Sequence, residues 1–584
     1  MAFGILEPSS GEKVPGTTHF YDDPSQPQTA TERDTARLKC DTSGKIPIIL
    51  VRLRPLSGVD SIRQQVPQPS DDPNDPLNWP LWKRDLVTFV LCWAGVLATS
   101  LGPILAANTV TLFRLFSITF TKVALLTGYF LLGAGAAAIF FVPSGRVWGK
   151  RHLFLLGILI IIASSAWAGS AGTNYGSLLG ARVLQGVGTA PYESLLNAAV
   201  GDLYFVHQRG VRMAFTNLAV FGGAFFTPIV VGKITDTMGW KWTFYFVSIF
   251  MAATLPAVFL LCPETAYRRD TKLNTDTNAE AEEEMKLQSR IATVSNPPSD
   301  EEESPKQRAG FILFPTSRAL QPIGNARTPK KTFAESLSLF DGAKTDERYW
   351  VLLLRPFPLI FNPAFIWGCL IQGTMIGWTI FIGVLVAAIF IGPPYFWGEI
   401  PAGYAYTGAF VGALCGFAIS GLLADSSVKY LTRKNHGVYE PEFRILLVIP
   451  MLVVGGIGLF GFALTAGNVI SGEFSYIVPL VFFGFEVAGM VIGAVASSLY
   501  IVDAYRDLTV EGFTLMIIFK NIFSFILTFF AYDWLIKGGI KHTLIAISIV
   551  QVVVCITSIP MYVFGKRCRA FYHRHDLLAL TGLQ

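Results

Sequence analysis

Apolar runs of about 20 residues, repeated along a chain of 584 residues, constrain the fold more than any other feature of the sequence. A bilayer core of about 30 Å requires roughly 20 apolar residues per helix. The runs therefore predict membrane-spanning helices, six in each half of the chain. The predicted spans lie at about 86–106, 123–143, 152–170, 176–199, 213–234, 243–262, 362–390, 403–424, 444–465, 474–500, 512–532 and 541–564.

Charged residues are scarce and unevenly placed. They make up 15% of the chain, below the quarter or so that is usual in soluble domains. Of 87 charged residues, 21 lie in 1–84 and 29 in 264–356, which leaves 37 for the other 407 positions. This distribution argues against a soluble globular protein, a nucleic-acid binder and a disulfide-stapled module. We expect an integral membrane protein that contacts the lipid bilayer and no nucleic acid.

Basic residues between the spans predict the orientation. Loops after even-numbered spans carry ten lysines and arginines, whereas loops after odd-numbered spans carry six. By the positive-inside rule, both termini and the middle segment face the cytoplasm. The predicted organisation is an all-α membrane protein with a largely disordered cytoplasmic tail (1–84), a six-helix bundle (85–263), a cytoplasmic middle loop (264–356), a second six-helix bundle (357–565) and a short cytoplasmic tail (566–584).

Sequence motifs of enzymes are missing. We find no nucleotide-binding loop, metal-ligand cluster or nucleophile arrangement in the sequence. The glycine pair Gly186-Val-Gly188 lies inside a predicted span rather than after a strand, so it does not predict a dinucleotide site. We therefore expect no enzymatic activity, no cofactor and no metal.

Four ionisable residues lie well inside predicted spans. Arg182 and Glu193 are eleven residues apart in span 4, which places them within about 20° on one helix face, together with Gln185. Glu486 lies in span 10 and Lys520 in span 11. Such groups cost several kcal/mol in a membrane unless they face a cavity or a partner. We therefore expect them to couple protons or to bind substrate charge; the alternative is that neighbouring helices satisfy them structurally.

The two acids are the candidates for proton coupling, because a carboxylate in a low-dielectric cavity can load and release protons. Glu193 is the first candidate and Glu486 the second. Counted from the turn between spans 10 and 11, Glu486 lies about 21 Å and Lys520 about 13 Å away. An extended lysine nearly bridges that difference, so an intramembrane pair of Glu486 with Lys520 is one hypothesis.

Polar and aromatic side chains in the spans suggest a substrate pocket. Aromatic faces attract cations, and amide groups supply hydrogen bonds. The alternative is that these side chains pack or lie at the membrane interfaces. The candidates are Asn108, Tyr129, Gln185, Gln372, Trp378 and Asn521.

Five segments carry a family resemblance. They are Asp75-Pro-Leu-Asn-Trp-Pro80, Arg146-Val-Trp-Gly149-Lys150-Arg151, Arg182 through Gly210, Gly222 through Gly232, and Arg433-Lys-Asn-His-Gly-Val-Tyr-Glu-Pro-Glu-Phe-Arg444. On these segments the chain resembles the major facilitator superfamily, specifically the fungal twelve-span group that includes drug:proton antiporters and polyamine-type transporters.

The resemblance implies a gate at the loop after span 2. Gly149, Lys150 and Arg151 match the superfamily pattern, but Arg146 stands where the pattern has an acid. The counterpart after span 8 keeps both glycine and acid, at Gly421 and Asp425. The resemblance implies that Asp425 pairs with basic residues across the cytoplasmic gate; the alternative is a topology signal alone.

The resemblance also extends to the antiporter motif of span 5. Pro228 and Gly232 match that motif, whereas Thr227 and Val231 replace expected glycines. Small residues let helices approach closely, and close packing alone also explains the glycines.

The function that the resemblance implies is proton-coupled secondary transport of a small organic molecule by alternating access between two bundles. Efflux of a drug or secondary metabolite across the plasma membrane, by a monomer, is the favoured form. Proton-driven uptake of an organic cation such as a polyamine is the alternative. A nutrient sensor that keeps the fold without transporting is a third hypothesis.

Overall fold

The computed structural model describes residues 72–268 and 330–583, apart from gaps at 392–394, 436–437, 471–472, 506–507 and 576. Of the tail before residue 72, it describes 4–8, 14, 16–19, 40–41, 63–64 and 70. Much of the predicted tail (1–84) and middle loop (264–356) therefore lies outside the described residues.

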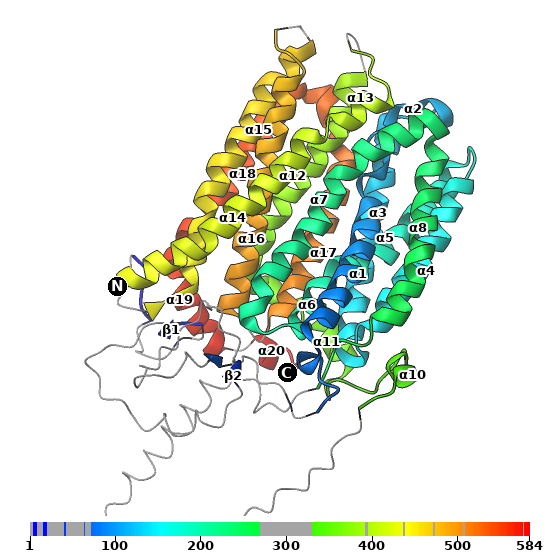
Figure 1. Ribbon diagram of the computed structural model, residues 1–584. Helices are drawn as coiled ribbons and strands as arrows, with labels where there is room; N and C mark the ends of the chain where they lie inside the picture. Colours follow the sequence, from blue (N-terminus) through cyan, green and yellow to red (C-terminus); the bar gives the residue numbers. More distant parts are fainter. Residues whose placement is uncertain are drawn as a thin grey trace, which may run out of the picture.

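Long helices run side by side in one elongated body (Figure 1). In the first half they are α1 (Leu81–Ser100), α3 (Phe120–Trp148), α4 (Arg151–Ser170), α5 (Tyr175–Ser194) continued by α6 (Leu196–Leu203), α7 (Val206–Met238) and α8 (Trp240–Leu261). In the second half they are α12 (Pro363–Ile391), α14 (Thr407–Lys434), α15 (Val448–Ile470), α16 (Ile477–Ala504), α17 (Thr509–Gly538) and α18 (Ile540–Ile556) continued by α19 (Ser558–Arg574).

Shorter elements connect these helices. The short α-helices are α2 (Thr109–Phe116), α10 (Phe333–Ser336), α11 (Tyr349–Leu354), α13 (Glu399–Tyr404) and α20 (Leu577–Leu580). The 3-10 helices are η3 (Pro76–Asn78), η4 (Pro103–Leu105), η6 (Pro358–Phe361) and η7 (Pro441–Leu447). Two-residue strands form two antiparallel pairs, β1 (Thr18–His19) with β4 (Val438–Tyr439) and β2 (Cys40–Asp41) with β3 (Arg63–Gln64).

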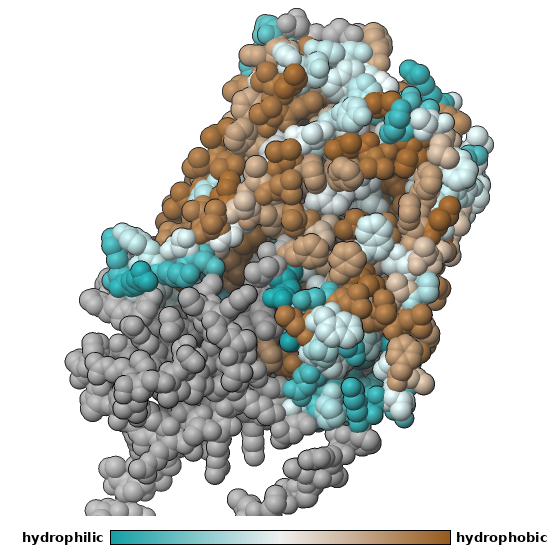
Figure 2. Space-filling model, viewed as in Figure 1, coloured by the Kyte–Doolittle hydropathy of each residue, from teal (hydrophilic) through white to brown (hydrophobic). Residues whose placement is uncertain are grey.

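The predicted all-α membrane fold is confirmed. Among the described residues, ten helical segments are long and apolar enough to cross a membrane. The two remaining long helices, α1 and α5, have 20 residues each, but α5 contains Arg182 and Glu193 and α1 begins with charged residues. Apolar side chains cover the visible face of the helices, with hydrophilic residues gathered at the two ends (Figure 2).

Glycines bring the helices within each half into close contact. A side-chain carbon on Gly186 of α5 would collide with the carbonyl oxygen of Phe130 in α3. In the second half, one on Gly412 of α14 would collide with the carbonyl oxygen of Gly484 in α16. Small residues at such positions let two backbones approach closely where lipid supplies no hydrophobic driving force.

The two ends of the bundle differ. The N-terminal segment, the C-terminus, α10 and α20 lie at one end, here called the terminal end, whereas α2 and α13 lie at the other, here called the distal end (Figure 1). At the terminal end, the described part of the tail packs on the second half. Ile5 is fully buried beside Tyr439 and Phe443, and Glu7 forms an ion pair with Lys566 at 2.7 Å.

The close approach of α5 to α3 generates a stability prediction. We expect Gly186→Ala to lower the free energy of unfolding by about 1–3 kcal/mol, because the added methyl group has no space against the Phe130 carbonyl. Thermal unfolding of the purified protein, monitored by size-exclusion chromatography, measures this loss of stability. Gly421→Ala is the control, since Gly421 has no atom within 4 Å of an added carbon. Equal melting temperatures for the two variants would contradict this account of the α3–α5 contact.

Candidate functional site

An ion pair joins the two halves of the chain. The Lys520 ammonium in α17 donates to a carboxylate oxygen of Glu193 in α5. The Asn521 amide donates to the other oxygen of Glu193 at 3.2 Å. The Lys520 side chain is 10% exposed and that of Glu193 is 19% exposed. The carboxylate is therefore held almost entirely by groups from the opposite half.

Both charges lie at the middle depth of the bundle. Lys520 is eleven residues beyond the start of α17 at Thr509, which corresponds to about 17 Å along the helix. Glu193 is ten residues before the end of α6 at Leu203, or about 15 Å from the terminal end. This depth is where a fixed charge costs most in a membrane, so the partner matters energetically.

The pair belongs to a continuous seam between α3 and α17. Gly135 allows α17 to approach, since a carbon added there would lie 3.0 Å from the Asn521 side chain. Four contacts follow the seam from the distal to the terminal end: Phe120 stacked on Tyr532, Gly128 against Thr528, Gly135 against Asn521, and Arg146 paired with Glu511. The two helices are antiparallel and stay in register over this whole length.

The halves also touch at both ends. At the distal end, an added carbon on Gly232 of α7 would lie 2.5 Å from the Glu399 carbonyl, and one on Gly403 would lie 2.5 Å from that of Pro228. At the terminal end, the void beside Arg146 and Glu511 holds only about 10 Å³. The two halves are therefore in contact at both ends, and the predicted motif residues Pro228 and Gly232 lie at the distal contact.

Arg182 is satisfied within the first half. It is completely buried and donates to the carbonyl oxygens of Leu101 at 2.7 Å and Leu126 at 3.2 Å. It also donates to the side chain of Gln185 at 2.8 Å, and Gln185 in turn donates to Ser165 at 3.3 Å. These contacts tie α5 to its neighbours, and the described residues give Arg182 no carboxylate partner.

Glu486 forms a separate buried site in the second half. Thr379 donates to one of its oxygens at 2.8 Å, and the other oxygen has no partner among the described residues. The hypothesis that Glu486 pairs with Lys520 differs from the structure, in which Lys520 pairs with Glu193. Similar depth is not sufficient for contact, because Lys520 points from α17 toward the first half whereas Glu486 packs inside the second.

The predicted pocket residues are divided among several contacts. Asn521 and Tyr129 lie on the seam, where the Tyr129 ring is 5.5 Å from that of Phe525. Asn108 is buried and accepts from Thr235 at 2.5 Å. Trp378 donates to Gln551 at 3.0 Å. Gln372, on α12, is half-buried.

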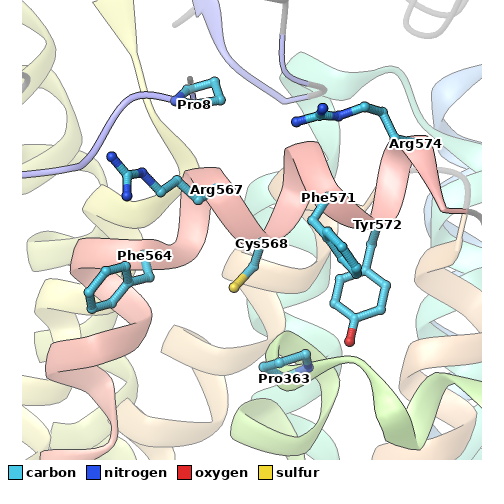
Figure 3. Close-up of a pocket in the computed structure, with 8 residues that line it drawn as sticks. All are labelled: Pro8, Pro363, Phe564, Arg567, Cys568, Phe571, Tyr572 and Arg574. Carbon is cyan, nitrogen blue, oxygen red and sulfur yellow. The ribbon is translucent and has the colours of Figure 1, made fainter. Parts of the chain in front are cut away.

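An open groove of about 520 Å³ lies away from the charged centre, at the terminal end (Figure 3). It runs along α19, and its other sides are formed by Pro363, at the start of α12, and by Pro8 of the tail. None of the predicted site residues lines it.

The loop after α3 is fixed by an acid that the sequence motif did not indicate. Gly149 has a φ of +94°, a conformation that L side chains rarely adopt. Directly after it, the main-chain amides of Lys150 and Arg151 each donate to the Glu264 carboxylate at 3.0 Å. The Lys150 ammonium pairs with Asp202. Glu264 therefore caps the start of α4, where a negative charge is stabilising.

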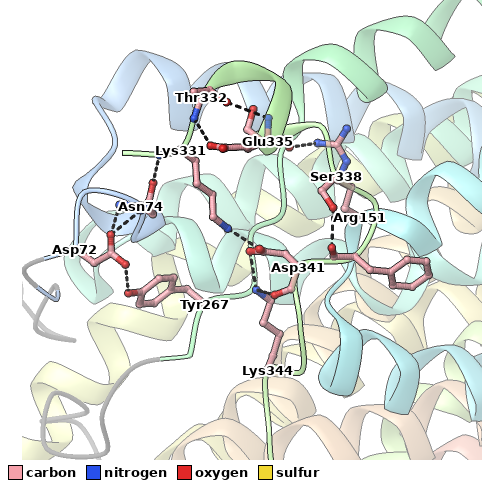
Figure 4. Close-up of polar contacts among 12 residues, drawn as sticks. Asp72, Asn74, Arg151, Tyr267, Lys331, Thr332, Glu335, Ser338, Asp341 and Lys344 are labelled. Carbon is pink, nitrogen blue, oxygen red and sulfur yellow. Dashed lines mark hydrogen bonds and ion pairs between the residues drawn. The ribbon is translucent and has the colours of Figure 1, made fainter. Parts of the chain in front are cut away.

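Polar residues of the middle loop cover the same end (Figure 4). Arg151 donates to the Ser336 carbonyl at 2.8 Å. Asp341 pairs with Lys331 at 2.5 Å and with Lys344 at 3.0 Å. Partial burial opposes ionisation of Asp341, but the two ammonium groups lower the pKa of its carboxyl below the ordinary value. The last part of the loop is thus attached to the first bundle.

The predicted gate motif of Gly421 and Asp425 lies inside α14, which continues to Lys434 beyond the predicted span, and it makes no comparable contact. Asp425 is exposed and has no ion pair with any residue that the structure describes. Arg146, which stands where the superfamily pattern has an acid, pairs instead with Glu511 across the seam. Sequence reasoning missed Glu511, although an acid in the first turn of a helix is a recognisable signal.

Comparison with known proteins agrees with this architecture. The Major Facilitator Superfamily profile matches residues 86–528. An uncharacterised MFS-type transporter of Schizosaccharomyces pombe is 23% identical over 517 residues, covering 86% of this chain and 87% of its own. Protein HOL1 of Saccharomyces cerevisiae is 23% identical over 553 residues, covering 88% and 92%. Efflux pump FUB11 of Gibberella moniliformis is 26% identical over 440 residues, covering 75% and 65%.

A solved structure supports the same fold. That of the proton:xylose symporter XylE aligns with a TM-score of 0.53 at 12% sequence identity, covering 83% of this chain and 96% of XylE. The profile match alone spans most of the helical part of the chain. This protein belongs to the Major Facilitator Superfamily.

Proposed function

We propose that this superfamily transporter is a proton-coupled secondary active transporter of a small organic molecule, with Glu193 as the group that binds the coupling proton. The observation that carries the proposal is the Glu193–Lys520 pair, whose members come from opposite halves and meet at mid-depth. Protons and a small organic substrate are accordingly the proposed partners.

The Glu193–Lys520 pair couples protonation of Glu193 to movement of the two halves. Alternating access requires the two halves to separate at one end at a time, and the described contacts hold them together along the α3–α17 seam. Separation removes Lys520 and Asn521 from Glu193 and leaves a carboxylate without its partners. A proton on Glu193 removes that charge and so lowers the cost of separation. Proton binding and rearrangement of the halves are thereby coupled.

A second candidate function is transport of an organic cation. In the structure the Glu193 carboxylate and the Asn521 amide sit around a primary ammonium, that of Lys520. A substrate that carries an ammonium group has the same chemistry and would compete with Lys520 for Glu193. Uptake of such a cation, for example a polyamine, is the alternative to efflux.

For direction and location, we propose efflux across the plasma membrane by a monomer, with the terminal end in the cytoplasm. The excess of basic residues in the loops at that end supports the orientation. The names of relatives such as efflux pump FUB11 support export, as does the resemblance of Pro228 and Gly232 to the antiporter motif. A non-transporting sensor of the same fold remains the third candidate.

One prediction from the proposed function concerns proton coupling. We expect Glu193→Gln to reduce pH-gradient-driven flux of an organic substrate by at least about tenfold, because a group that cannot ionise no longer carries the proton. Flux is measured in reconstituted vesicles with a panel of organic cations and hydrophobic drugs. Asp236→Asn is the matched control, since Asp236 is an exposed acid at the distal end of α7.

Each result in this assay decides between the candidates. Flux that persists in Glu193→Gln as in the control contradicts the coupling role of Glu193 and makes Glu486 the next acid to change. The sign of flux relative to the gradient separates export from uptake. Binding of a compound without flux under any gradient identifies the sensor.

A further prediction concerns the contribution of the Glu193–Lys520 pair to stability. We expect Lys520→Gln to lower the free energy of unfolding by about 3–5 kcal/mol, since it leaves a mostly buried carboxylate unpaired. The double variant Glu193→Gln/Lys520→Gln should lose less, because it removes both charges. Thermal unfolding in detergent measures both, with Lys537→Gln as the control at an exposed lysine of the same helix. Additive losses in the double variant would show that the two side chains do not interact.

A further inference from the structure

The described end of the middle loop leads into a connection that runs from the first half to α12. This connection, residues 344–355, is here called the strap, and it includes α11. Its start is attached to α3, because the Lys344 main-chain amide donates to the Val147 carbonyl at 2.8 Å. The Tyr349 ring stacks on that of Trp148, with 5.3 Å between the ring centroids. The start of the strap is therefore fixed to the first half.

The end of the strap is attached to the second half. The Nε of Arg355 donates to the carbonyl oxygen of Leu583, in the segment that follows α20, at 2.8 Å. Leu359, in η6 shortly after the strap, is 1% exposed and packs in the apolar core of the second half. Between the two attachments, α11 lies at the terminal end of the bundle (Figure 1). Separation of the halves at this end must therefore change the conformation of the strap or break its attachments.

Four charged side chains meet where the strap crosses the α3–α17 seam. The Glu347 carboxylate lies 3.3 Å from the Arg146 guanidinium and 2.6 Å from that of Arg355. The Arg355 guanidinium also lies 3.8 Å from the carboxylate of Glu511, which pairs with Arg146. The four charges alternate in sign around a ring, so each one has two neighbours of opposite charge.

Two of these ion pairs join groups that are held by different halves. Arg146 and Glu347 are fixed to the first half, whereas Glu511 and Arg355 are fixed to the second. The Arg146–Glu511 and Glu347–Arg355 pairs therefore hold the terminal end together. Without Glu347, the two arginines would share Glu511 alone, and their mutual repulsion would oppose the attraction between the halves. The Glu511 and Arg355 side chains are only 4% and 10% exposed, so solvent screens them less than charges on an open surface.

An apolar side chain of the strap contributes to the same closure. Leu352 is 3% exposed. Together with Pro143 of α3 and Val510 of α17, it lines the void of about 10 Å³ at this end. A side chain between two helices excludes water only while the helices stay close together. The strap therefore closes the terminal end by packing as well as by charge.

We propose that Glu347 is a gate residue and that the strap holds the terminal end closed. The superfamily pattern has an acid at the position of Arg146, and Glu347 supplies an acid beside that position from the middle loop. Opening of this end lengthens both ion pairs that join the halves, so the middle loop contributes directly to the cost of opening. The proposal rests on the alternating access of the proposed function, but not on Glu193 or on the chemistry of the substrate.

The test measures hydrogen–deuterium exchange of the full-length protein in nanodiscs, without substrate or a pH gradient. We expect Glu347→Gln to speed exchange of the amides at 509–516, the start of α17, by at least about threefold, as the loss of one partly exposed ion pair allows. Amides of α13, at the distal end, should exchange no faster, because opening at one end leaves the other closed. Arg355→Gln should act in the same way.

The double variant Glu347→Gln/Arg355→Gln measures whether the two residues act as a pair. It should raise exchange at 509–516 no more than the larger single change does, because both changes remove the same contact. Arg348→Gln is the matched control, since Arg348 is an exposed residue of the strap, and it should leave exchange unchanged.

Three results would overturn the proposal. Faster exchange at both ends of Glu347→Gln would indicate a general loss of stability. Unchanged exchange in Glu347→Gln, with faster exchange in Glu511→Gln, would show that the Arg146–Glu511 pair alone closes this end. Multiplied effects in the double variant would show that Glu347 and Arg355 act independently. None of these measurements uses flux, so their failure is distinct from the failure of proton coupling at Glu193.

Discussion

The requirement that a charge in hydrocarbon have a partner organises the centre of this protein. Glu193 and Lys520 meet this requirement with each other, although 327 positions separate them in the sequence. Since one comes from each half, their attraction is also an attraction between the halves. A pair inside one bundle would stabilise that bundle, but its energy would not depend on where the other bundle lies. The location of this pair, rather than its strength, makes it suited to sense rearrangement of the halves.

The α3–α17 seam determines how closely the two charges can approach. Gly128 and Gly135 have no side chain where Thr528 and Asn521 press against α3. A larger residue at Gly135 would push α17 away at the level of Lys520 and lengthen the ion pair. The Arg146–Glu511 pair at the terminal end and the Phe120–Tyr532 stack at the distal end then fix the register. The small residues of the seam therefore determine how closely the two central charges can pair.

Much of the fold follows from the sequence because hydropathy and helix length are local properties. Each predicted span overlaps an observed helix, including α5, which contains Arg182 and Glu193, although α14 continues ten residues beyond its predicted span. The pairing of charges did not follow, because it depends on which side of each helix faces which neighbour. Glu486 illustrates the limit: its partner Thr379 carries no charge and gives no signal. Arg182 illustrates it again, since the main-chain carbonyls that hold it are present at every position of every helix.

A proton and an organic cation would release the central pair in different ways. An organic cation replaces Lys520 at Glu193 and leaves a free ammonium, whereas a proton neutralises Glu193 and leaves the same ammonium facing a neutral acid. In both cases Lys520 must find water or another acceptor as the halves separate, because a buried ammonium without a partner is costly. Asn521 can stay with Glu193 in either case until the halves separate, since an amide donates to a carboxylate and to the carbonyl oxygen of a carboxylic acid alike. The lysine, more than the acid, would therefore set the cost of separating the halves.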